Sequence, residues 1–173
     1  MREKTRWLTK AAAVAALACG LLVSLTGTRA LAATVTKCSG EQHKSFPTPG
    51  NDTDIYITVC IHTISTYERL AWYYLSWKDG GDSDVDDDRK FDKFTVQIRI
   101  ERYDSVQNDI SQSLRASINT HSTGTYDYTG YSAGYTDTDR LGGWTADATV
   151  TYNIDRDGEG DYKWQLTGSP QVT

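Results

Sequence analysis

The sequence lacks the short motifs that mark common enzyme folds. It contains no Gly-x-Ser-x-Gly, no His-Glu-x-x-His and no phosphate-binding glycine loop. It therefore gives no support for a serine hydrolase, a zinc protease or a nucleotide-binding enzyme. Histidine is also scarce, and His43, His62 and His121 do not have the spacing of metal ligands. We predict a protein that is not an enzyme.

A long apolar run is missing as well. The longest one, 11–25, is shorter than a membrane-spanning helix needs. It follows a basic start and precedes Ala30-Leu31-Ala32, a cleavage site of the small-x-small type. We therefore predict a signal peptide over 1–32 and a single extracellular domain over 33–173, with no membrane association after cleavage. Lipid attachment at Cys19 is the alternative, although apolar residues continue beyond it.

Cysteine is nearly absent from the predicted domain, which contains only Cys38 and Cys60. In an oxidising compartment an even pair predicts a disulfide, whereas a catalytic thiol would need an unpaired cysteine beside a histidine. The bond would close a loop of about 20 residues and stabilise the fold by roughly 3 kcal/mol.

The sequence has fewer basic than acidic residues. Removing residues 1–32 takes away five of the 18 basic residues and one of the 23 acidic residues, so the formal net charge falls from −5 to −9. Such a surface repels a phosphate backbone, and nucleic acid is therefore excluded as a partner.

Alternation of apolar and polar residues is the dominant pattern that is present. Asp54 to Ser65 places Ile55, Ile57, Val59 and Ile61 on one face and Tyr56, Thr58, Cys60, His62 and Ile64 on the other. Phe91 to Tyr103 is predicted to be a strand with one wet face. Its apolar face carries Phe94, Val96, Ile98 and Ile100. The stretches 144–154 and 162–167 form a predicted hairpin around a turn at Asp155 to Asp161.

Two segments are ambiguous. Tyr67 to Lys78 shows helical spacing after a capping box, Ser65-x-x-Glu68, but it also alternates. We favour a central strand that is covered on both faces. Ile110 to Asn119 alternates too, although Val106, Ile110, Leu114 and Ile118 would form a helical stripe. Its serine content favours a strand.

Short strands, turn signals and one disulfide predict an all-β fold, an antiparallel β-sandwich. A small β-barrel is the alternative. Thr34 to Lys37 would be the most available edge for strand pairing with a partner.

Carboxylates gather in two loops. Six of them lie between Asp79 and Asp88, a segment that resembles a calcium loop at Asp82, Asp84 and Asp86 but lacks its glycine and its final glutamate. We interpret it as a solvated loop. Asp155, Asp157, Glu159 and Asp161 are the second candidate for calcium, at the predicted hairpin turn. Otherwise no cofactor is expected.

Tyrosine is abundant, and several tyrosines cluster in one segment. The candidate binding residues are Tyr126, Tyr128, Tyr131 and Tyr135. Tyrosine gives a large contact area at low entropic cost, and the intervening glycine and serine are adaptable. The segment would bind a protein or stack on sugars; alternatively its rings cover one end of the sandwich.

A resemblance adds to this interpretation. Trp77-Lys-Asp-Gly-Gly81, Phe91-Asp-Lys-Phe94 and Ile98-Arg-Ile-Glu-Arg-Tyr-Asp104 resemble segments of small secreted β-domain proteins of actinobacteria such as Streptomyces. The chain also resembles the adaptor subunit of umbrella toxin particles. In that family a secreted β-domain joins a lectin subunit to a repeat-bearing toxin polypeptide. The resemblance implies an actinobacterial source and an adaptor role, and it assigns no site residue.

Three functional hypotheses follow. The first is a secreted, non-enzymatic β-sandwich that acts through protein–protein contact, as an adaptor in an extracellular toxin particle. The second is a carbohydrate-binding module, with calcium as a possible aid. The third is a hydrolase that uses a carboxylate pair, for which 22 acidic residues offer many unspecific pairings.

Overall fold

The computed structural model describes residues 34–80, 89–127, 133–136 and 141–173. The predicted signal peptide and the predicted first residue of the mature chain, Ala33, lie outside these ranges. The described elements are β1 Val35–Cys38, β2 Gln42–Phe46, β3 Thr53–Thr63, β4 Glu68–Asp79, β5 Phe91–Arg102, β6 Ser105–Ser113, α1 Arg115–Thr120, β7 Thr123–Asp127, β8 Ala133–Thr136, β9 Trp144–Ile154 and β10 Tyr162–Gln165.

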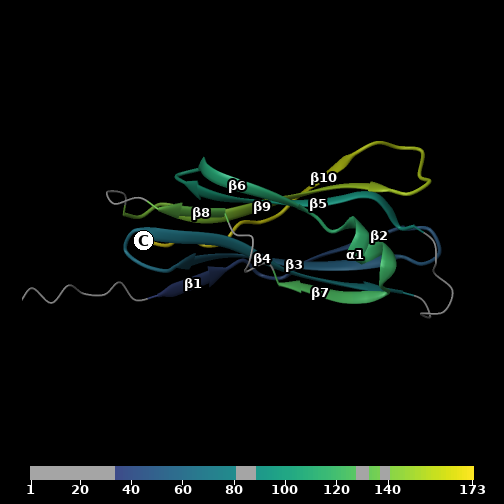
Figure 1. Cartoon of the computed structure of the whole chain (residues 1–173), viewed down its shortest axis with the longest axis horizontal. Helices are drawn as coiled ribbons and strands as arrows, with labels where there is room; N and C mark the ends of the chain where they lie inside the picture. The colour runs from purple at the N-terminus through teal and green to yellow at the C-terminus, as the bar shows by residue number, and fades with distance from the viewer. Residues whose placement is uncertain (1–33, 81–88, 128–132, 137–140) are drawn as a thin grey trace, which may run out of the picture. The chain divides into compact units, whose positions relative to one another are not determined.

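The strands form two antiparallel sheets that face each other as layers (Figure 1). In the six-stranded sheet the order is β1-β3-β4-β7, with β2 also on β3 and β8 also on β4. In the four-stranded sheet the order is β10-β9-β5-β6. The predicted sandwich is thereby confirmed, and the sheets do not close into the alternative barrel.

Alternation explains the layers, because every second side chain of each long strand points inward. The inner row of β3 is Ile55, Ile57, Val59 and Ile61, and that of β5 is Phe94, Val96, Ile98 and Ile100; all of them are fully buried. Both predicted face assignments are therefore confirmed. The inner rows of the two sheets form one hydrophobic core.

An aromatic cluster joins the sheets at one end of this core. Phe46 of β2 lies edge-on to Phe91, Phe94, Tyr152 and Trp164, with ring centroids 4.8 to 6.0 Å apart. The first two partners belong to β5, and the others to β9 and β10. Edge-to-face pairs of this kind add to the free energy gained from burial alone.

The disulfide lies on the outer face of the six-stranded sheet. Cys38 of β1 is directly opposite Cys60 of β3 in the strand register, and the two are bonded. The predicted pairing and the predicted face are both confirmed. Because β1 has only four residues, its hydrogen-bond ladder is short, and the disulfide adds a covalent link between β1 and β3.

The segment that the sequence left ambiguous, Tyr67 to Lys78, is strand β4. It is central, between β3 and the pair β7 and β8, as predicted. The predicted cover on its second face is wrong, because Tyr74 is 39% exposed there. Ser65 and Glu68 exchange backbone hydrogen bonds in a turn between β3 and β4, in place of the expected helix cap.

The prediction of a strand from Ile110 to Asn119 is right only in its first half. β6 ends at Ser113, and α1 follows at Arg115. One helical turn buries Leu114 and Ile118, four residues apart, against the core. The turn also brings Asn119 beside β5, where its Oδ1 accepts hydrogen bonds from the backbone N–H groups of Lys90 and Phe91. These bonds replace the ladder that a continuing β6 would have made.

The predicted hairpin is confirmed as β9 and β10. Val150 is opposite Trp164, and Tyr152 is opposite Tyr162. In the other hairpin of this sheet, β5–β6, two residues turn the chain, Tyr103 and Asp104, both with positive φ. This conformation matches a two-residue turn to the twist of its strands.

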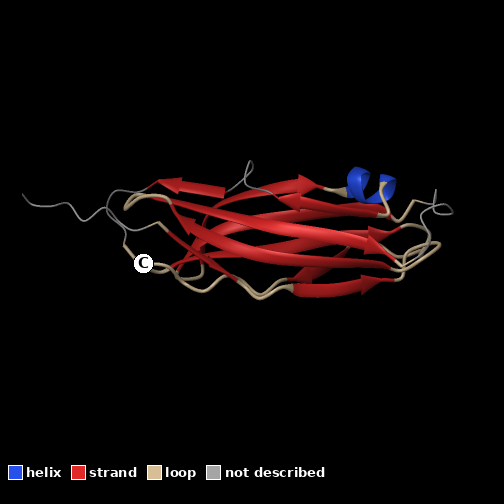
Figure 2. Cartoon of the chain, turned by 90° about the horizontal axis from the view of Figure 1, so that it is seen from below, coloured by secondary structure: helices blue, strands red, loops and turns tan. Residues whose placement is uncertain are grey.

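Figure 2 shows α1 at one end of the strands. No helix in the described ranges is long and apolar enough to cross a membrane.

Candidate functional site

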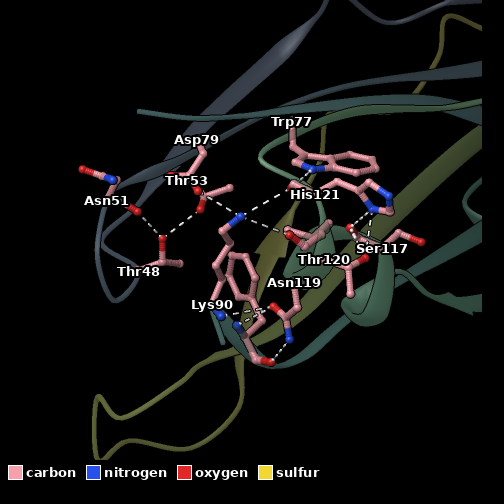
Figure 3. A network of polar contacts seen from close by, with 12 residues as sticks. Thr48, Asn51, Thr53, Trp77, Asp79, Lys90, Ser117, Asn119, Thr120 and His121 are labelled. Atoms are coloured by element: carbon pink, nitrogen blue, oxygen red, sulfur yellow. Dashed lines mark hydrogen bonds and ion pairs between the residues drawn. The ribbon is translucent and has the colours of Figure 1, made fainter. Parts of the chain in front are cut away.

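The most unusual polar feature of the interior is an ion pair between Lys90 and Asp79 (Figure 3). Nζ of Lys90 lies 2.9 Å from Oδ2 of Asp79, and each side chain is only 2% exposed. Two opposite charges at this depth have lost most of their hydration, which is costly unless other polar groups replace the water.

Some of this replacement is visible around the lysine. Nζ donates to the backbone oxygens of Ile118, at 3.3 Å, and His121, at 3.4 Å. The indole Nε1 of Trp77 donates to the same His121 oxygen at 2.9 Å. The end of α1 and the residue after it therefore supply the acceptors for the buried cation.

The carboxylate of Asp79 has fewer polar contacts than the lysine. Neither oxygen of Asp79 accepts a well-directed hydrogen bond from a described side chain or backbone group, although Oδ2 is in ion-pair contact with the lysine. The backbone N–H of Asp79 donates to Ser122, so the strand end itself is fixed. The carboxylate thus depends on Lys90 alone among the groups described.

The strand pattern places Asp79 in the interior. Alternation along β4 sends Ala71, Tyr73, Leu75 and Trp77 inward, and one further step sends Asp79 the same way. Arg69 is buried at the opposite end of this row and donates to the backbone oxygens of Ser65 and Thr66. Burial lowers the pKa of Arg69 below its ordinary value. The interpretation of Asp79 as part of a solvated loop is therefore wrong, because its side chain continues the buried row of β4.

Chemically, the buried pair brings an amine nitrogen next to a carboxyl group, and the nitrogen becomes a nucleophile only when it gives up its proton. Because both side chains are shielded from solvent, a soluble substrate has no access to them in this structure.

The outer face of the six-stranded sheet has a different character. It carries Tyr56 of β3 with Trp72 and Tyr74 of β4, and we call these three residues the aromatic face. Trp72 is opposite Cys60 and Tyr74 is opposite Thr58, so both lie in the middle of the sheet. Tyr74 is exposed, and the other two are half-buried. No hydrogen bond joins their polar atoms to another described residue.

Two histidines flank the aromatic face. His43 stacks on Tyr56, with ring centroids 4.6 Å apart, and its Nε2 donates to Oδ1 of Asp54 at 2.8 Å. This hydrogen bond is the main reason why the pKa of Asp54 lies below its ordinary value. His62 shares a 2.7 Å hydrogen bond with Thr36. Each of the two is thus a hydrogen-bonded surface residue.

The outer face of the four-stranded sheet is polar, and its groups are paired with one another. Arg99 contacts Glu101 at 2.9 Å, Asp147 at 3.2 Å and Thr149 at 2.8 Å. Thr149 in turn donates to Gln165. We call these five residues the polar face. Their bonds run across β5, β9 and β10, so the hydrogen-bonding groups of the polar face are paired within the protein.

The predicted tyrosine cluster is only partly visible, because Tyr128 and Tyr131 lie outside the described residues. Tyr126 of β7 and Tyr135 of β8 are half-buried and pack against the core. The Tyr135 ring lies 4.9 Å from that of Trp144. These two tyrosines thus contribute to packing, which was the alternative interpretation of the cluster.

The predicted calcium residues at the β9–β10 turn are placed as follows. Asp155 is paired with Arg89 and Arg156, and Asp161 is paired with Lys93. Oδ1 of Asp157 accepts a hydrogen bond from the backbone N–H of Glu159. Among the described residues, no three histidine, cysteine or acidic side chains are grouped as a metal would need. The other candidate, Asp82, Asp84 and Asp86, lies outside them.

Comparison with known proteins gives no further guide, since no protein-family model, curated protein or solved structure matches this chain.

Proposed function

We propose that this protein is a secreted, non-enzymatic β-sandwich that binds a partner protein through the aromatic face. The observation that carries the proposal is the state of Trp72 and Tyr74. Both lie in the middle of the outer sheet face, where Tyr74 is 39% exposed and Trp72 is half-buried, and no hydrogen bond joins their polar atoms to another described residue. Tryptophan and tyrosine are the residue types that contribute most to the centre of protein–protein interfaces.

The surroundings of the aromatic face suit a protein partner. Thr58 and Ser76 stand beside the rings on the same face, and His43 and Asp54 flank them, which gives a polar rim around an apolar centre. The strand β1 runs along the edge of the same sheet and pairs with β3 alone among the described strands. Its other edge is a second contact surface that could accept a strand from a partner.

Two contact surfaces on one sheet are what an adaptor needs. The face would hold one partner, and the edge at β1 would hold another. This arrangement supports the adaptor role that the resemblance to umbrella toxin particles implies, and it gives that role definite residues.

A pull-down from the culture medium of the organism that encodes the protein tests the proposal. Tagged wild-type protein should recover a partner in stoichiometric amount, and Trp72→Ala should lose it. Thr151→Ala is the matched control, because Thr151 points outward from the other sheet and pairs with Thr95 of β5. Recovery of no stoichiometric partner by folded wild-type protein would contradict the proposal.

A carbohydrate is the second candidate, and the same rings favour it. Trp72 and Tyr74 are two residues apart on one strand, so their side chains project from the same flat face. Flat rings of this kind can stack on sugar rings. A glycan array with wild-type protein and Trp72→Ala, each with and without calcium, distinguishes this candidate. Silence of the wild-type protein on the array would remove it.

A further inference from the structure

We propose that Lys90 and Asp79 form a covalent cross-link site, in which the side-chain amine and the side-chain carboxyl condense to an amide. The link would join the end of β4 in the six-stranded sheet to the residue before β5 in the four-stranded sheet. This inference is independent of the partner that the aromatic face binds.

The first argument is position. Nζ lies 2.9 Å from Oδ2, which brings the amine within reach of Cγ (Figure 3). Two acceptors, the backbone oxygens of Ile118 and His121, hold Nζ in place from the side of α1. Groups fixed in this way react as if they were present at very high concentration, because the entropy of bringing them together has been lost on folding.

The second argument is the environment. Both side chains are 2% exposed, and Oδ1 of Asp79 has no donor among the described groups. A buried ion pair is costly when the remaining oxygens are unsatisfied. Condensation removes both charges, and the shielding that makes the pair costly also keeps out the water that would hydrolyse an amide.

The chemical step is balanced without any other reactant. The ammonium of Lys90 transfers one proton to Oδ2, which leaves a neutral amine and a neutral acid in contact. Nζ then attacks Cγ, and the bond between Cγ and the protonated oxygen breaks. That oxygen leaves as water, with a second proton that comes from Nζ. No other carboxylate is paired with Lys90 in the described ranges, so the proton moves within the pair.

The test is peptide mapping of the full chain, purified as secreted, by trypsin digestion and mass spectrometry. If the link is present, Lys90 resists cleavage. Peptide 79–89 is then recovered joined to peptide 90–93, with a mass lower than their sum by one water. If the pair is only ionic, peptides 79–89 and 91–93 are recovered separately at full mass, which would overturn the proposal.

One side reaction also removes a water and must be distinguished from the cross-link. Asp79 is followed by Gly80, and an aspartate in this sequence can close on the next backbone nitrogen to form a succinimide. Peptide 79–89 would then be short of one water but not joined to 90–93. This outcome would overturn the proposal too.

Two variants sharpen the assignment. Lys90→Arg keeps a cation beside Asp79 but removes the amine, so its peptides should be separate and of full mass. Lys93→Arg is the matched control, because Lys93 lies three residues away on the surface and pairs with Asp161. It should keep the link in full. A cross-linked product that survives in Lys90→Arg would contradict the assignment to Lys90.

Discussion

The two outer faces of this sandwich are built by the same alternation and have opposite properties. On the four-stranded sheet, Arg99 of β5 binds both Asp147 and Thr149 of β9, so the polar groups of this face are paired with one another. On the six-stranded sheet, Trp72 and Tyr74 present rings whose polar atoms are unpaired among the described residues.

The difference favours the aromatic face over the polar face as the proposed binding surface. A face whose charges and hydroxyls are satisfied within the molecule gains little from a partner, since each new bond would replace an existing one. A face with unpaired aromatic side chains gains apolar burial and new hydrogen bonds at once. The aromatic face is therefore the binding surface that we propose, and the polar face is the solvated face of the other sheet.

The largest effect is expected when a charged residue replaces a buried one. This substitution tests which side chains of β5 point into the core, and the comparison of the two outer faces depends on that assignment. Ile98 is fully buried on β5, and Ile98→Asp would bury an unpaired carboxylate. We expect a loss of about 4 kcal/mol or more in the free energy of unfolding, and little folded protein in the medium.

Thr95 supplies the control. It projects from the opposite face of β5, where its register partners are Ser113 and Thr151, and Thr95→Asp should give a normal yield of folded protein. Normal yields of Ile98→Asp would mean that the inner and outer faces have been exchanged.

The disulfide gives the next largest effect, and it belongs to the sheet that carries the aromatic face. Cys60→Ser removes a link between residues 22 apart in sequence, and we expect a loss of roughly 3 kcal/mol. Denaturant unfolding measures it, with Thr58→Ser on the same strand face as the control. If reduction of the wild-type protein left its melting temperature unchanged, the stabilising role of the bond would be refuted.

Breaking the polar face should cost less and should not affect binding. Arg99 is 16% exposed and holds Glu101, Asp147 and Thr149. Arg99→Ala should lower the free energy of unfolding by about 1 to 2 kcal/mol. Partner recovery in the pull-down should be unchanged. If Arg99→Ala lost partner binding and kept its stability, the binding surface would lie on the four-stranded sheet, which would contradict the proposal.

The smallest effect concerns the rim of the aromatic face. The hydrogen bonds from His43 and Ser45 hold the pKa of Asp54 below its ordinary value of 3.8. Because the folded pKa is the lower one, the carboxylate stabilises the fold above the ordinary pKa, and this contribution is lost as the pH falls through the folded pKa. Melting curves of wild type and Asp54→Asn should therefore converge in acid. A constant difference at all pH values would contradict this.

Much of the fold could be predicted from the sequence because its long strands alternate strictly. The inner rows of β3 and β5, the β9–β10 hairpin and the disulfide all follow from local pattern and residue type. These are features that each strand or each cysteine pair encodes by itself.

The errors arose where a third element decides the outcome. Apolar residues on both sides of β4 predicted cover on both faces, yet only the inner face has a sheet opposite it. Leu114 and Ile118 suit a strand or a helix equally, and the choice of helix depends on the hydrogen bonds that Asn119 makes beside β5. Contacts between residues this far apart cannot be predicted from the alternation of apolar and polar residues within one segment.

The candidate site was harder to predict from the sequence than the fold. In the sequence, the candidate functional residues are clusters of one residue type, the tyrosines and the carboxylates. The structure instead brings together Asp79 and Lys90 from the two sides of an acidic segment, and Tyr56 and Tyr74 from different strands. Only the continued alternation of β4 into Asp79 could have indicated the buried pair in advance.

The most direct test compares two tyrosines of nearly equal exposure on the two sheets. Tyr74 on β4 is 39% exposed and Tyr162 on β10 is 40% exposed. Once the partner has been isolated, its affinity should be measured by titration against Tyr74→Ala and Tyr162→Ala. We expect Tyr74→Ala to weaken binding about tenfold or more and Tyr162→Ala to leave it unchanged. Equal affinities for both variants would contradict the claim that the aromatic face is the binding surface.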